Sequence, residues 1–561
     1  MSRGGVLVLA ALVVCALAIP STAPLAAAQE QRTLYVAPQG SDSGTCAQQS
    51  PCTSFDRAYQ VARPGDVVEV AGGTYPDQRL SYDPSKTSSD DVIFRPAADG
   101  QVVTGELDFG GRPSPTAASH VTIDGQGRWA SGEILFFLRD PARPASDITL
   151  QNLKMRRDSG IFIHGADHVT LRNVEIGPSC CGTDGMNLVP DDVGDVHRDV
   201  TNLLLDHVTI HDIVRLCAQD KTAPPTCRDQ PEAHTDCIQA WSGVNVTIRD
   251  SRFINCSTSS LLVEGGFGGT VSNWTVENNM FGPSAEGSVN FIFFVGNQPG
   301  LLRGTSRVAY NSMAGSIKAD PEAFAPGAGI DVVGNITVVG GGCSEGLRYS
   351  HNLFTDGKRC GPTDRSGNAA FVSNTPYGTD LHLGASSAAT GAGDPKDHPP
   401  LDIDGDARPL RSAPDAGADQ REPASISVGR SIGAVALGNT LQSVQARYGK
   451  AAVRRVKGSD LSLSTYRLRR VGALRVYSRG TRVVAISTGS AYYTTPKGAG
   501  VGVPAPAGTG TWDACAKAYR VGRGARATLF RTFRGKQSAK VVQVVVGAGA
   551  LPVRPAPKGC G

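Results

Sequence analysis

The sequence is poor in charged and aromatic residues, which make up 19% and 6% of its 561 positions. Its 55 basic and 51 acidic residues leave a net charge of only +4, and no arginine-rich run occurs. Nucleic-acid-binding proteins concentrate basic residues on one face or segment, so we expect no nucleic-acid partner. Helical periodicity is also nearly absent from the middle of the chain, which argues against a fold that alternates strands and helices.

Long apolar runs are missing after the first residues. The run at residues 6–19 follows Arg3 and precedes the small residues 26–28. This order is typical of a cleaved export signal, and the run is shorter than the ~20 residues that span a bilayer. We therefore expect a signal peptide at residues 1–28, no membrane span, and a secreted or cell-surface protein.

Of the 13 cysteines, Cys15 lies within the apolar run, and the even number that remains predicts disulfides in an exported protein. No second CxxC or HxxxH motif accompanies them, so zinc is the less favoured interpretation. Sequence proximity predicts the pairs Cys46–Cys52, Cys217–Cys227, Cys343–Cys360 and Cys515–Cys560. The pairing of Cys180, Cys181, Cys237 and Cys256 stays open.

Glycine and proline are abundant, with 67 and 35 residues, which suits turn-rich β structure. A short phrase recurs from about residue 119. It consists of a β-rich run, then Asn, Asp or Ser, then an apolar residue, at intervals from about 21 residues upward, which is in the range of solenoid repeats. The copies span residues 120–124, 147–152, 168–173, 202–207, 245–250, 273–278, 307–311 and 347–352.

A second phrase lies between copies of the first, at residues 159–163, 184–188, 236–240 and 259–263. Each predicted strand is too short to be stable alone, but coiling stacks equivalent strands in parallel ~4.8 Å apart. Asn and Asp tolerate the bent backbone at coil corners and can form ladders. A β-sandwich would need Asn-Gly hairpins, which are missing. The repeat therefore predicts an all-β, right-handed parallel β-helix over residues 29–421.

Short phrases at the two ends of this region carry a resemblance. The opening phrases lie at 34–38, 40–42, 51–52, 62–68 and 72–75, and the closing phrases at 380–383, 386–388, 391–393, 402–405, 408–409 and 414–418. They resemble the first and last coils of secreted pectate-lyase-like β-helix proteins. The resemblance covers residues 33–421 and implies the fold, with a short helix near residues 55–62 capping the solenoid. It does not specify a reaction.

The composition changes near Glu422. Residues 432–450 predict a strand, a turn and a short helix, and residues 474–486 predict a hairpin. Residues 514–546 loosely repeat that order, so we expect a small α+β module at 422–561, faintly similar to exported modules that bind other proteins. Basic residues suggest attachment to an anionic cell-surface polymer, although a solvated face explains them more simply: Arg454, Arg455, Lys457, Arg467, Arg469 and Arg470.

The two longest interruptions of the repeat, residues 177–201 and 211–235, suggest loops that wall a site. Polar residues gather beside them. In the predicted register Gln239 faces outward over Asn187, and His234 and Asp236 lie at the corner that enters the same strand. We expect catalytic roles for His234, Asp236, Asp184 and Lys221, and substrate binding by Gln239, Asn187, His211, Asp212 and Arg215.

The chemistry of these residue types suggests polysaccharide cleavage. A histidine beside a carboxylate can act as a general base. β-Elimination on a uronic acid needs a base at C5 and a group that stabilises the enolate, for which Gln239, Asn187 and Lys221 are candidates. Hydrolysis would instead need two flanking carboxylates, for which Asp184 and Asp236 are the pair to test.

Simpler roles compete with catalysis. An Asp at a coil corner often only caps backbone N–H groups, and Asn or Gln can form structural ladders. Calcium is an option because carboxylates line the corners, but no DxDxDG-like loop supports it, and we predict no metal-ligand set. The catalytic patterns of polygalacturonases and pectate lyases are absent, so no site residue is transferred from them.

Our leading hypothesis is a secreted protein that cleaves an acidic extracellular polysaccharide by β-elimination. The alternatives are a polysaccharide hydrolase and a non-catalytic cell-surface protein that binds glycan or a partner.

Overall fold

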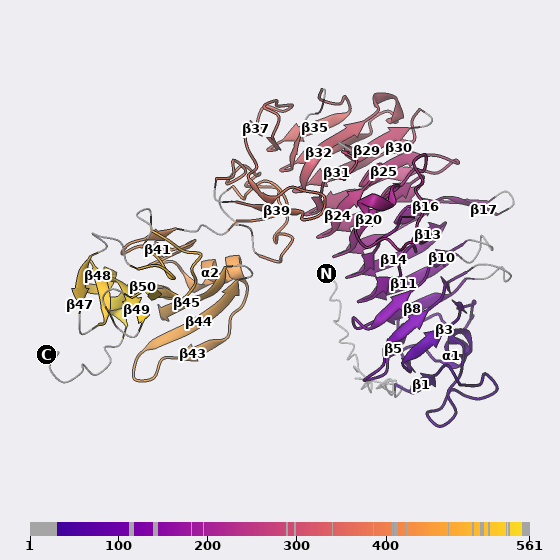
Figure 1. Cartoon of the computed structure of the whole chain (residues 1–561), viewed down its shortest axis with the longest axis horizontal. Coiled ribbons are helices and arrows are strands. Elements are labelled where there is room, and N and C mark those ends of the chain that lie inside the picture. The colour runs from indigo at the N-terminus through magenta and orange to yellow at the C-terminus, as the bar shows by residue number, and fades with distance from the viewer. Residues whose placement is uncertain are drawn as a thin grey trace, which may run out of the picture.

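The structure, a computed structural model, contains a right-handed parallel β-helix and a smaller antiparallel module (Figure 1). It describes residues 31–551 except for 111–116, 138–143, 181, 194–195, 288–289, 297–298, 339, 341, 385, 407, 409–412, 422–424, 469–470, 496–498, 505–509, 514–515, 534–535 and 537–538. The predicted signal peptide and Cys181, Cys515 and Cys560 lie outside the described residues.

Each coil of the solenoid contributes strands to three parallel series. The first series forms a twelve-stranded sheet. In spatial order its strands are β1 (Thr33–Val36), β2 (Val67–Val70), β5 (Val92–Pro96), β8 (Ser119–Asp124), β11 (Ser146–Gln151), β14 (Asp167–Arg172), β19 (Leu204–Asp206), β23 (Thr247–Arg249), β27 (Thr275–Glu277), β31 (Thr305–Ala309), β33 (Gly329–Val333) and β35 (Leu347–Ser350).

The second series contains β3 (Gly73–Tyr75), β6 (Val102–Thr104), β9 (Trp129–Ser131), β12 (Lys154–Met155), β15 (Glu175–Ile176), β20 (Thr209–Ile213), β24 (Arg252–Cys256), β28 (Met280–Phe281), β32 (Ser312–Ala319), β34 (Ile336–Val338), β36 (Leu353–Phe354) and β37 (Arg365–Ser366). The third contains β4 (Gln78–Arg79), β7 (Leu107–Asp108), β10 (Ile134–Phe136), β13 (Ile161–His164), β16 (Met186–Val189), β21 (Ile238–Ala240), β25 (Leu261–Gly265) and β29 (Asn290–Gly296). Because β29 pairs with β32, the two series join into one twenty-stranded sheet.

Short elements decorate this frame. The antiparallel hairpin of β17 (Asp191–Val193) and β18 (Val196–Arg198) projects from the solenoid after the third series (Figure 1). The strands β22 (Gly243–Val244), β26 (Val271–Ser272) and β30 (Leu302–Arg303) form a small parallel sheet. Two 3₁₀ turns, η1 (Cys217–Gln219) and η2 (Pro321–Ala323), lie in loops.

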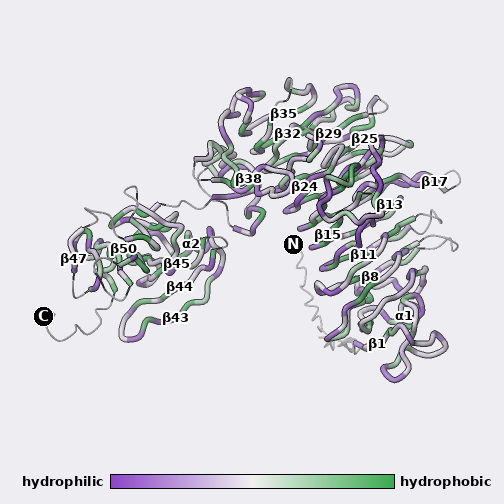
Figure 2. Tube along the Cα trace, in the orientation of Figure 1, coloured by the Kyte–Doolittle hydropathy of each residue, from purple (hydrophilic) through white to green (hydrophobic). Residues whose placement is uncertain are grey.

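The core follows from the alternation of inward apolar and outward polar residues along each strand. In β11, Ile148 and Leu150 are fully buried, and the residues between them are not. Hydrophobic and hydrophilic residues alternate in the same way along the solenoid in Figure 2. Inside, equivalent aromatic rings stack from coil to coil, with centroids 5.1 Å apart for Phe109 and Phe136 and 4.9 Å apart for Phe253 and Phe281.

Asparagines shape the corners as the repeat predicts. Asn152, Asn173 and Asn245 have left-handed backbone conformations, which asparagine tolerates better than most residues. A separate ladder of buried asparagines runs up the solenoid, and each amide bonds to the next coil within 3.2 Å: Asn279, Asn311, Asn335 and Asn352. These side chains satisfy backbone groups that the turn leaves without partners.

The amino-terminal end is capped as predicted. Helix α1 (Phe55–Val61) begins at Ser54, whose side chain accepts a hydrogen bond from the Arg57 N–H. Its buried residues Phe55, Ala58 and Tyr59 cover the first coil, and the Phe55 ring contacts Phe94 and Trp129 inside the solenoid. The helix thus shields apolar surface that the first coil would otherwise expose.

Disulfides connect neighbouring coils and loops. The predicted pairs Cys46–Cys52, Cys217–Cys227 and Cys343–Cys360 are confirmed, and Cys237 pairs with Cys256. The sulfur of Cys180 lies beside that of Cys227, which can bond to only one partner at a time. Within the described residues, no helix is long and apolar enough to cross a membrane.

After β37 the chain folds back along the solenoid, with the hairpin β38 (Phe371–Ser373) and β39 (Asp380–Leu383). Arg408 anchors this return segment: it is fully buried and donates hydrogen bonds to the carbonyls of Asp415 and Gly417 and to Asn278 Oδ1 of the solenoid. The resemblance implied that these residues form the last coil. The structure shows instead a segment that packs against the side of the solenoid.

The carboxyl-terminal module contains an eight-stranded antiparallel sheet in the order β43-β44-β45-β46-β50-β49-β48-β47. Its elements are β40 (Ile426–Ser427), β41 (Ser431–Ile432), β42 (Val435–Ala436), α2 (Leu441–Tyr448), β43 (Val453–Arg455), β44 (Leu461–Leu468), β45 (Gly472–Arg479), β46 (Arg482–Thr488), β47 (Thr511–Asp513), β48 (Ala518–Val521), η3 (Gly524–Arg526), β49 (Thr528–Thr532), β50 (Val541–Val546) and η5 (Ala548–Ala550).

The predicted helix and hairpin of the first half are present as α2 and as β45 with β46. The expected repeat of that order is wrong at its start, because residues 518–521 form strand β48 and not a helix. The alternation of Tyr519 and Val521 with Arg520 favours a strand at this position. Arg454 and Arg455 lie exposed on the edge strand β43.

Candidate functional site

The candidate site lies where strands β16 and β21 of the third series begin. Long loops, residues 177–185 and 214–237, lead into these two strands from the second series. The register pairs Asn187 of β16 with Gln239 of β21, as the repeat predicts. The disulfide between Cys237 and Cys256 ties the start of β21 to the neighbouring coil.

Three of the predicted catalytic residues converge at this corner. One ligand atom from each of Asp184, His234 and Asp236 lies within 4.8 Å of those of the other two. His234 Nδ1 is 2.8 Å from Asp236 Oδ2. The Asp236 backbone N–H donates to Asp184 Oδ1 at 2.6 Å, which links the two coils directly. The chain therefore brings together side chains that are 52 residues apart in sequence.

The three residues differ in how deeply their side chains are buried. The Asp236 side chain is 0% exposed and the His234 side chain is 50% exposed. Burial raises the pKa of Asp236, and the hydrogen bond that His234 donates to Asp236 raises the pKa of His234. Burial, with the Asp236 charge, raises the pKa of Asp184 to about 6. A buried carboxylate thus holds an accessible imidazole, the arrangement that orients a general base.

A row of hydrogen bonds extends from the cluster along the third series through Asn187 and Gln239, which are 8% and 9% exposed. Asn187 Nδ2 donates to Asp184 Oδ2 at 2.9 Å and lies 3.4 Å from Gln239 Oε1. Gln239 Nε2 donates to Glu264 Oε1 at 2.8 Å. Glu264 was not predicted from the sequence, although it directly follows the repeated phrase at 259–263. Extending that phrase by one residue would have found it.

The other predicted binding residues have partners of their own: His211 and Asp212 lie on β20 of the second series, and Arg215 lies in the loop that follows it. His211 Nδ1 is 2.8 Å from Asp212 Oδ2, and its Nε2 is 3.5 Å from Glu175. The hydrogen bond with Asp212 raises the pKa of His211. Arg215 forms an ion pair with Glu286. These contacts therefore join His211 and Arg215 to the second series and its loops.

Lys221, predicted as catalytic, contacts a different part of the chain. Its ammonium group lies 4.2 Å from the centroid of the Tyr377 ring, in the return segment. The neighbouring Asp220 pairs with Arg157 at 2.5 Å. These contacts hold the loop that carries His234, so the structure associates Lys221 with bracing of the loop.

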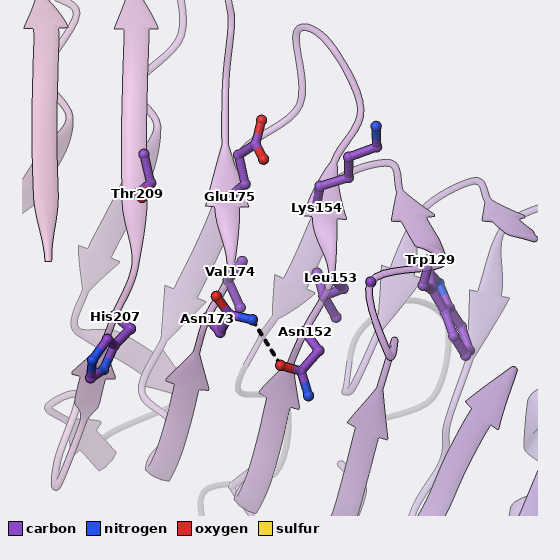
Figure 3. A pocket seen from close by; sticks show the side chains of 10 residues that line it. Trp129, Asn152, Leu153, Lys154, Asn173, Val174, Glu175, His207 and Thr209 are labelled. Atoms are coloured by element: carbon purple, nitrogen blue, oxygen red, sulfur yellow. Dashed lines mark hydrogen bonds between the residues drawn. The ribbon is translucent and has the colours of Figure 1, made fainter. Parts of the chain in front are cut away.

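A shallow cavity of about 220 Å³ lies elsewhere, at the corner between the first and second series (Figure 3). Asn173 Nδ2 donates to Asn152 Oδ1 at 2.8 Å across it, while Lys154 and Glu175 point away from this ladder. None of the predicted catalytic residues lines it. The hollow lies beside the stacked corner asparagines, its own titratable residues are Lys154, Glu175 and His207, and the residues of the His234 cluster are not among those that line it.

The cluster also offers ligand atoms for a cation. Asp184, Asp236 and His234 could each offer one ligand atom, and neither carboxylate oxygen of Asp236 has a hydrogen-bond partner among the described residues beyond its 2.8 Å contact with His234 Nδ1. Calcium takes about six to eight oxygen ligands. Two carboxylates and an imidazole do not complete such a shell, so these three residues alone do not fit calcium.

No family model and no curated protein matches the chain. Among solved structures, the pectate lyase Pel9A is 16% identical, with 70% of this chain and 97% of that chain covered and a TM-score of 0.42. A rhamnogalacturonan lyase is 15% identical, with 61% and 91% covered and a TM-score of 0.28. PfbA, a surface adhesin of Streptococcus pneumoniae, is 13% identical, with 54% and 80% covered and a TM-score of 0.32. The parallel β-helix of this chain is established by its own strand pairing.

Proposed function

We propose that this chain cleaves an acidic extracellular polysaccharide by β-elimination, with His234 as the general base. The observation that carries the proposal is the pairing of a half-exposed imidazole with a fully buried carboxylate, 2.8 Å apart, at the edge of an outer sheet. The disulfides of the described residues are consistent with an extracellular location.

In the proposed reaction His234 Nε2 removes the proton at C5 of a uronic acid. The electron pair moves to the carboxylate-derived enolate and then forms the C4–C5 double bond as the bond from C4 to the departing oxygen breaks. Asp236 accepts the hydrogen bond of Nδ1–H and stabilises the imidazolium that forms. In this proposal the remaining amide N–H groups of Asn187 and Gln239 donate hydrogen bonds to the enolate. The departing oxygen takes up one proton, which the imidazolium can supply.

The depth of Asp236 supports elimination over hydrolysis. A hydrolase needs two carboxylates that both reach the glycosidic bond, either directly or through a water. The side chain of Asp236 is 0% exposed, so it cannot contact a sugar together with Asp184. Supporting the imidazole is the role that its position allows.

A second candidate is non-catalytic binding of a glycan. Glu264 and Asp184 place negative charge beside His234, and an acidic polymer would be repelled by them. A row of amides and carboxylates can equally donate to and accept from the hydroxyl groups of a neutral sugar. If no acidic polymer is cleaved, the negative charge beside His234 favours the binding of a neutral glycan.

The test is a panel of uronate polymers incubated with the full chain, followed by absorbance of the unsaturated product and by reducing ends. His234→Ala should abolish the absorbance signal. His168→Ala is the matched control, because His168 also pairs with an aspartate, Asp167, at 2.9 Å, but at a corner of the first series. Reducing ends without absorbance would indicate hydrolysis. Binding with neither signal would overturn cleavage and favour the second candidate.

A further inference from the structure

Charge is divided very unevenly along the chain. Residues 422–561 hold 23 of the 55 basic residues but only three of the 51 acidic residues, Glu422, Asp460 and Asp513. The carboxyl-terminal module therefore has a net charge of +20, whereas residues 1–421 have a net charge of −16. The small net charge of the whole chain conceals two regions of opposite sign. A region so far from neutrality attracts polymers of the opposite charge.

The acidic residues of the module are too few to neutralise it. Asp460 pairs with Arg479 at 2.6 Å, and Asp513 pairs with Arg520 at 2.8 Å, so both carboxylates of the described part of the module are engaged. Within the described residues, three other arginines of the module have neither a hydrogen-bond partner nor an ion-pair partner: Arg454, Arg467 and Arg475. Their guanidinium groups are therefore available to an anion from outside the chain.

These three arginines lie on one face of the sheet, on the adjacent strands β43, β44 and β45 (Figure 1). Arg454 lies opposite Leu463 of β44, and Arg475 lies opposite Thr465. Leu463, Thr465 and Arg467 are spaced two residues apart along β44, so all these side chains share a face, while the residues between them face the core. We refer to Arg454, Arg467 and Arg475 as the basic face. Strand geometry places their Cα atoms about 8–14 Å apart.

Protection of the sheet edge explains only part of this charge. Charged residues on an edge strand prevent pairing with another chain, and Arg454 and Arg455 of β43 can serve that purpose. Arg467 and Arg475 belong to β44 and β45, each of which has a paired strand on both sides. Like charges brought together on one face repel one another, and a bound polyanion would offset that repulsion.

The basic face also carries a group that can contact a sugar. Tyr477 lies opposite Leu463 on the same face and is partly exposed. A tyrosine offers an apolar ring together with a hydroxyl group. An arginine offers a planar fork of donors that matches the two oxygens of a carboxylate. The combination fits a sugar that bears a carboxylate.

We propose that the basic face binds the carboxylate groups of an acidic polysaccharide and so retains the polymer that the solenoid cleaves. This inference rests on the proposed function for its choice of polymer. The solenoid region has a net charge of −16, and Asp184 and Glu264 add negative charge beside His234. The solenoid alone therefore repels a uronate polymer. The basic face supplies the attraction that the solenoid lacks.

The two regions have separable roles because they belong to one chain. A polymer held by the module is presented to the solenoid at a high effective concentration. The charge of the basic face does not reach the reacting sugar, because salt screens exposed charges beyond about 8–10 Å. The basic face should therefore lower KM for the polymer, while the His234 cluster sets kcat.

The experiment measures binding separately from cleavage. The full chain carrying His234→Ala is passed over surfaces coated with polygalacturonate, alginate or neutral dextran, and surface plasmon resonance gives the Kd. The triple substitution Arg454→Gln, Arg467→Gln and Arg475→Gln should raise the Kd for the uronate polymers about tenfold, which corresponds to ~1.4 kcal/mol. Binding should weaken with salt, and the triple variant should respond to salt less steeply, because each lost contact no longer releases a counterion. Dextran should not be retained.

The matched control removes the same charge from the solenoid. Arg95→Gln, Arg307→Gln and Arg348→Gln alter partly exposed arginines that pair with acidic residues of the solenoid region. This variant should keep the Kd of the parent, because the lost charges lie outside the basic face. Replacement of the three arginines of the basic face by lysine keeps the charge but not the fork, and should recover part of the affinity. Circular dichroism verifies the fold of each variant.

Several binding results would overturn the basic face. An equal Kd for the triple variant and its parent would do so, and so would an equal loss of affinity in the solenoid control. Retention of dextran as strong as that of the uronate polymers would show that charge is not recognised. A surface coated with double-stranded DNA tests another polyanion: retention on DNA but on neither uronate polymer would overturn the choice of partner.

The kinetic outcomes separate this inference from the proposed reaction. In the chain that keeps His234, the triple variant should raise KM and leave kcat unchanged. A polymer that is retained through the basic face but never cleaved would support the basic face and overturn elimination. A polymer that the triple variant cleaves with an unchanged KM would overturn the basic face and leave elimination standing.

Discussion

Two histidine–carboxylate clusters in this molecule use the same residue types in opposite ways. His234 pairs with Asp236 through Nδ1 and is 50% exposed, so its other ring nitrogen is accessible. His382, in the return segment, is 6% exposed, and both of its ring nitrogens are engaged, Nδ1 by Asp380 and Nε2 by Asp404 at 2.8 Å. The first arrangement leaves a position for a substrate proton, and the second does not.

The difference shows that accessibility separates the two roles better than composition does. At the His382 cluster, Arg252 of the solenoid approaches Asp404 at 3.5 Å, and the buried Asp419 accepts a hydrogen bond from the Leu383 N–H. Burial raises the pKa of Asp419 to about 6. These contacts join the return segment to the solenoid, so the cluster acts as a latch, whereas His234 faces a loop-walled surface.

The largest expected effect is on stability at the latch. His382→Ala would leave Asp404 and Asp419 buried without the imidazole, and removal of one member of a buried ion pair typically costs about 3–5 kcal/mol. We expect a decrease of that size in the free energy of unfolding, measured by guanidinium titration with circular dichroism. His168→Ala, at a pair in which both side chains are partly exposed, should change it by less than ~1 kcal/mol. Equal losses at His382 and His168 would show that burial of the pair does not set the effect.

The next effect concerns the pH dependence of the proposed reaction. The hydrogen bond that His234 donates to Asp236 raises the pKa of His234, so the base form accumulates only as pH rises above that pKa. The rate should therefore increase with pH on the acidic limb. Asp236→Asn removes the charge that raises this pKa, and burial, which lowers it, then dominates. The acidic limb of the pH–rate profile should therefore move to lower pH. The maximum kcat/KM should fall about hundredfold.

The measurement is kcat/KM for the polymer found in the panel, over the pH range in which the fold is stable. The control is Asp167→Asn, which alters the partner of His168 and should leave the limb in place. A limb that stays fixed in Asp236→Asn would show that another group titrates. That result would remove the functional distinction between the His234 cluster and the His382 cluster.

Much of the fold could be predicted because a repeat carries it. Alternation along each phrase defines which residues face inward, and stacking then makes Asn187 and Gln239 neighbours. The convergence of His234, Asp236 and Asp184 follows from the same register. Asp184 and Asp236 each lie two residues before the first residue of their strands, so stacking of the strands brings them together. Periodicity therefore places side chains on or next to strands.

The rest could not be predicted because loops do not follow the repeat. Lys221 and Arg215 lie in an insertion whose path depends on contacts with Tyr377 and Glu286, both distant in sequence. Burial could not be predicted either, because the sequence does not show that His234 is half-exposed and that His382 is buried. The expected second helix of the terminal module was wrong because strand pairing with β49 sets the structure of residues 518–521.

The smallest effect tests Lys221, which the sequence suggested as catalytic and the structure associates with bracing. A cation–π contact such as that with Tyr377 contributes about 0.5–1 kcal/mol at an exposed site. Lys221→Met keeps the length of the side chain and removes the charge, so kcat/KM should fall by less than tenfold, with the pH profile unchanged. Tyr377→Phe, which keeps the ring, should behave like the unmodified chain, and Tyr377→Ala should match Lys221→Met. A loss as large as that of Asp236→Asn would instead place the ammonium group at the reacting sugar and return Lys221 to the catalytic set.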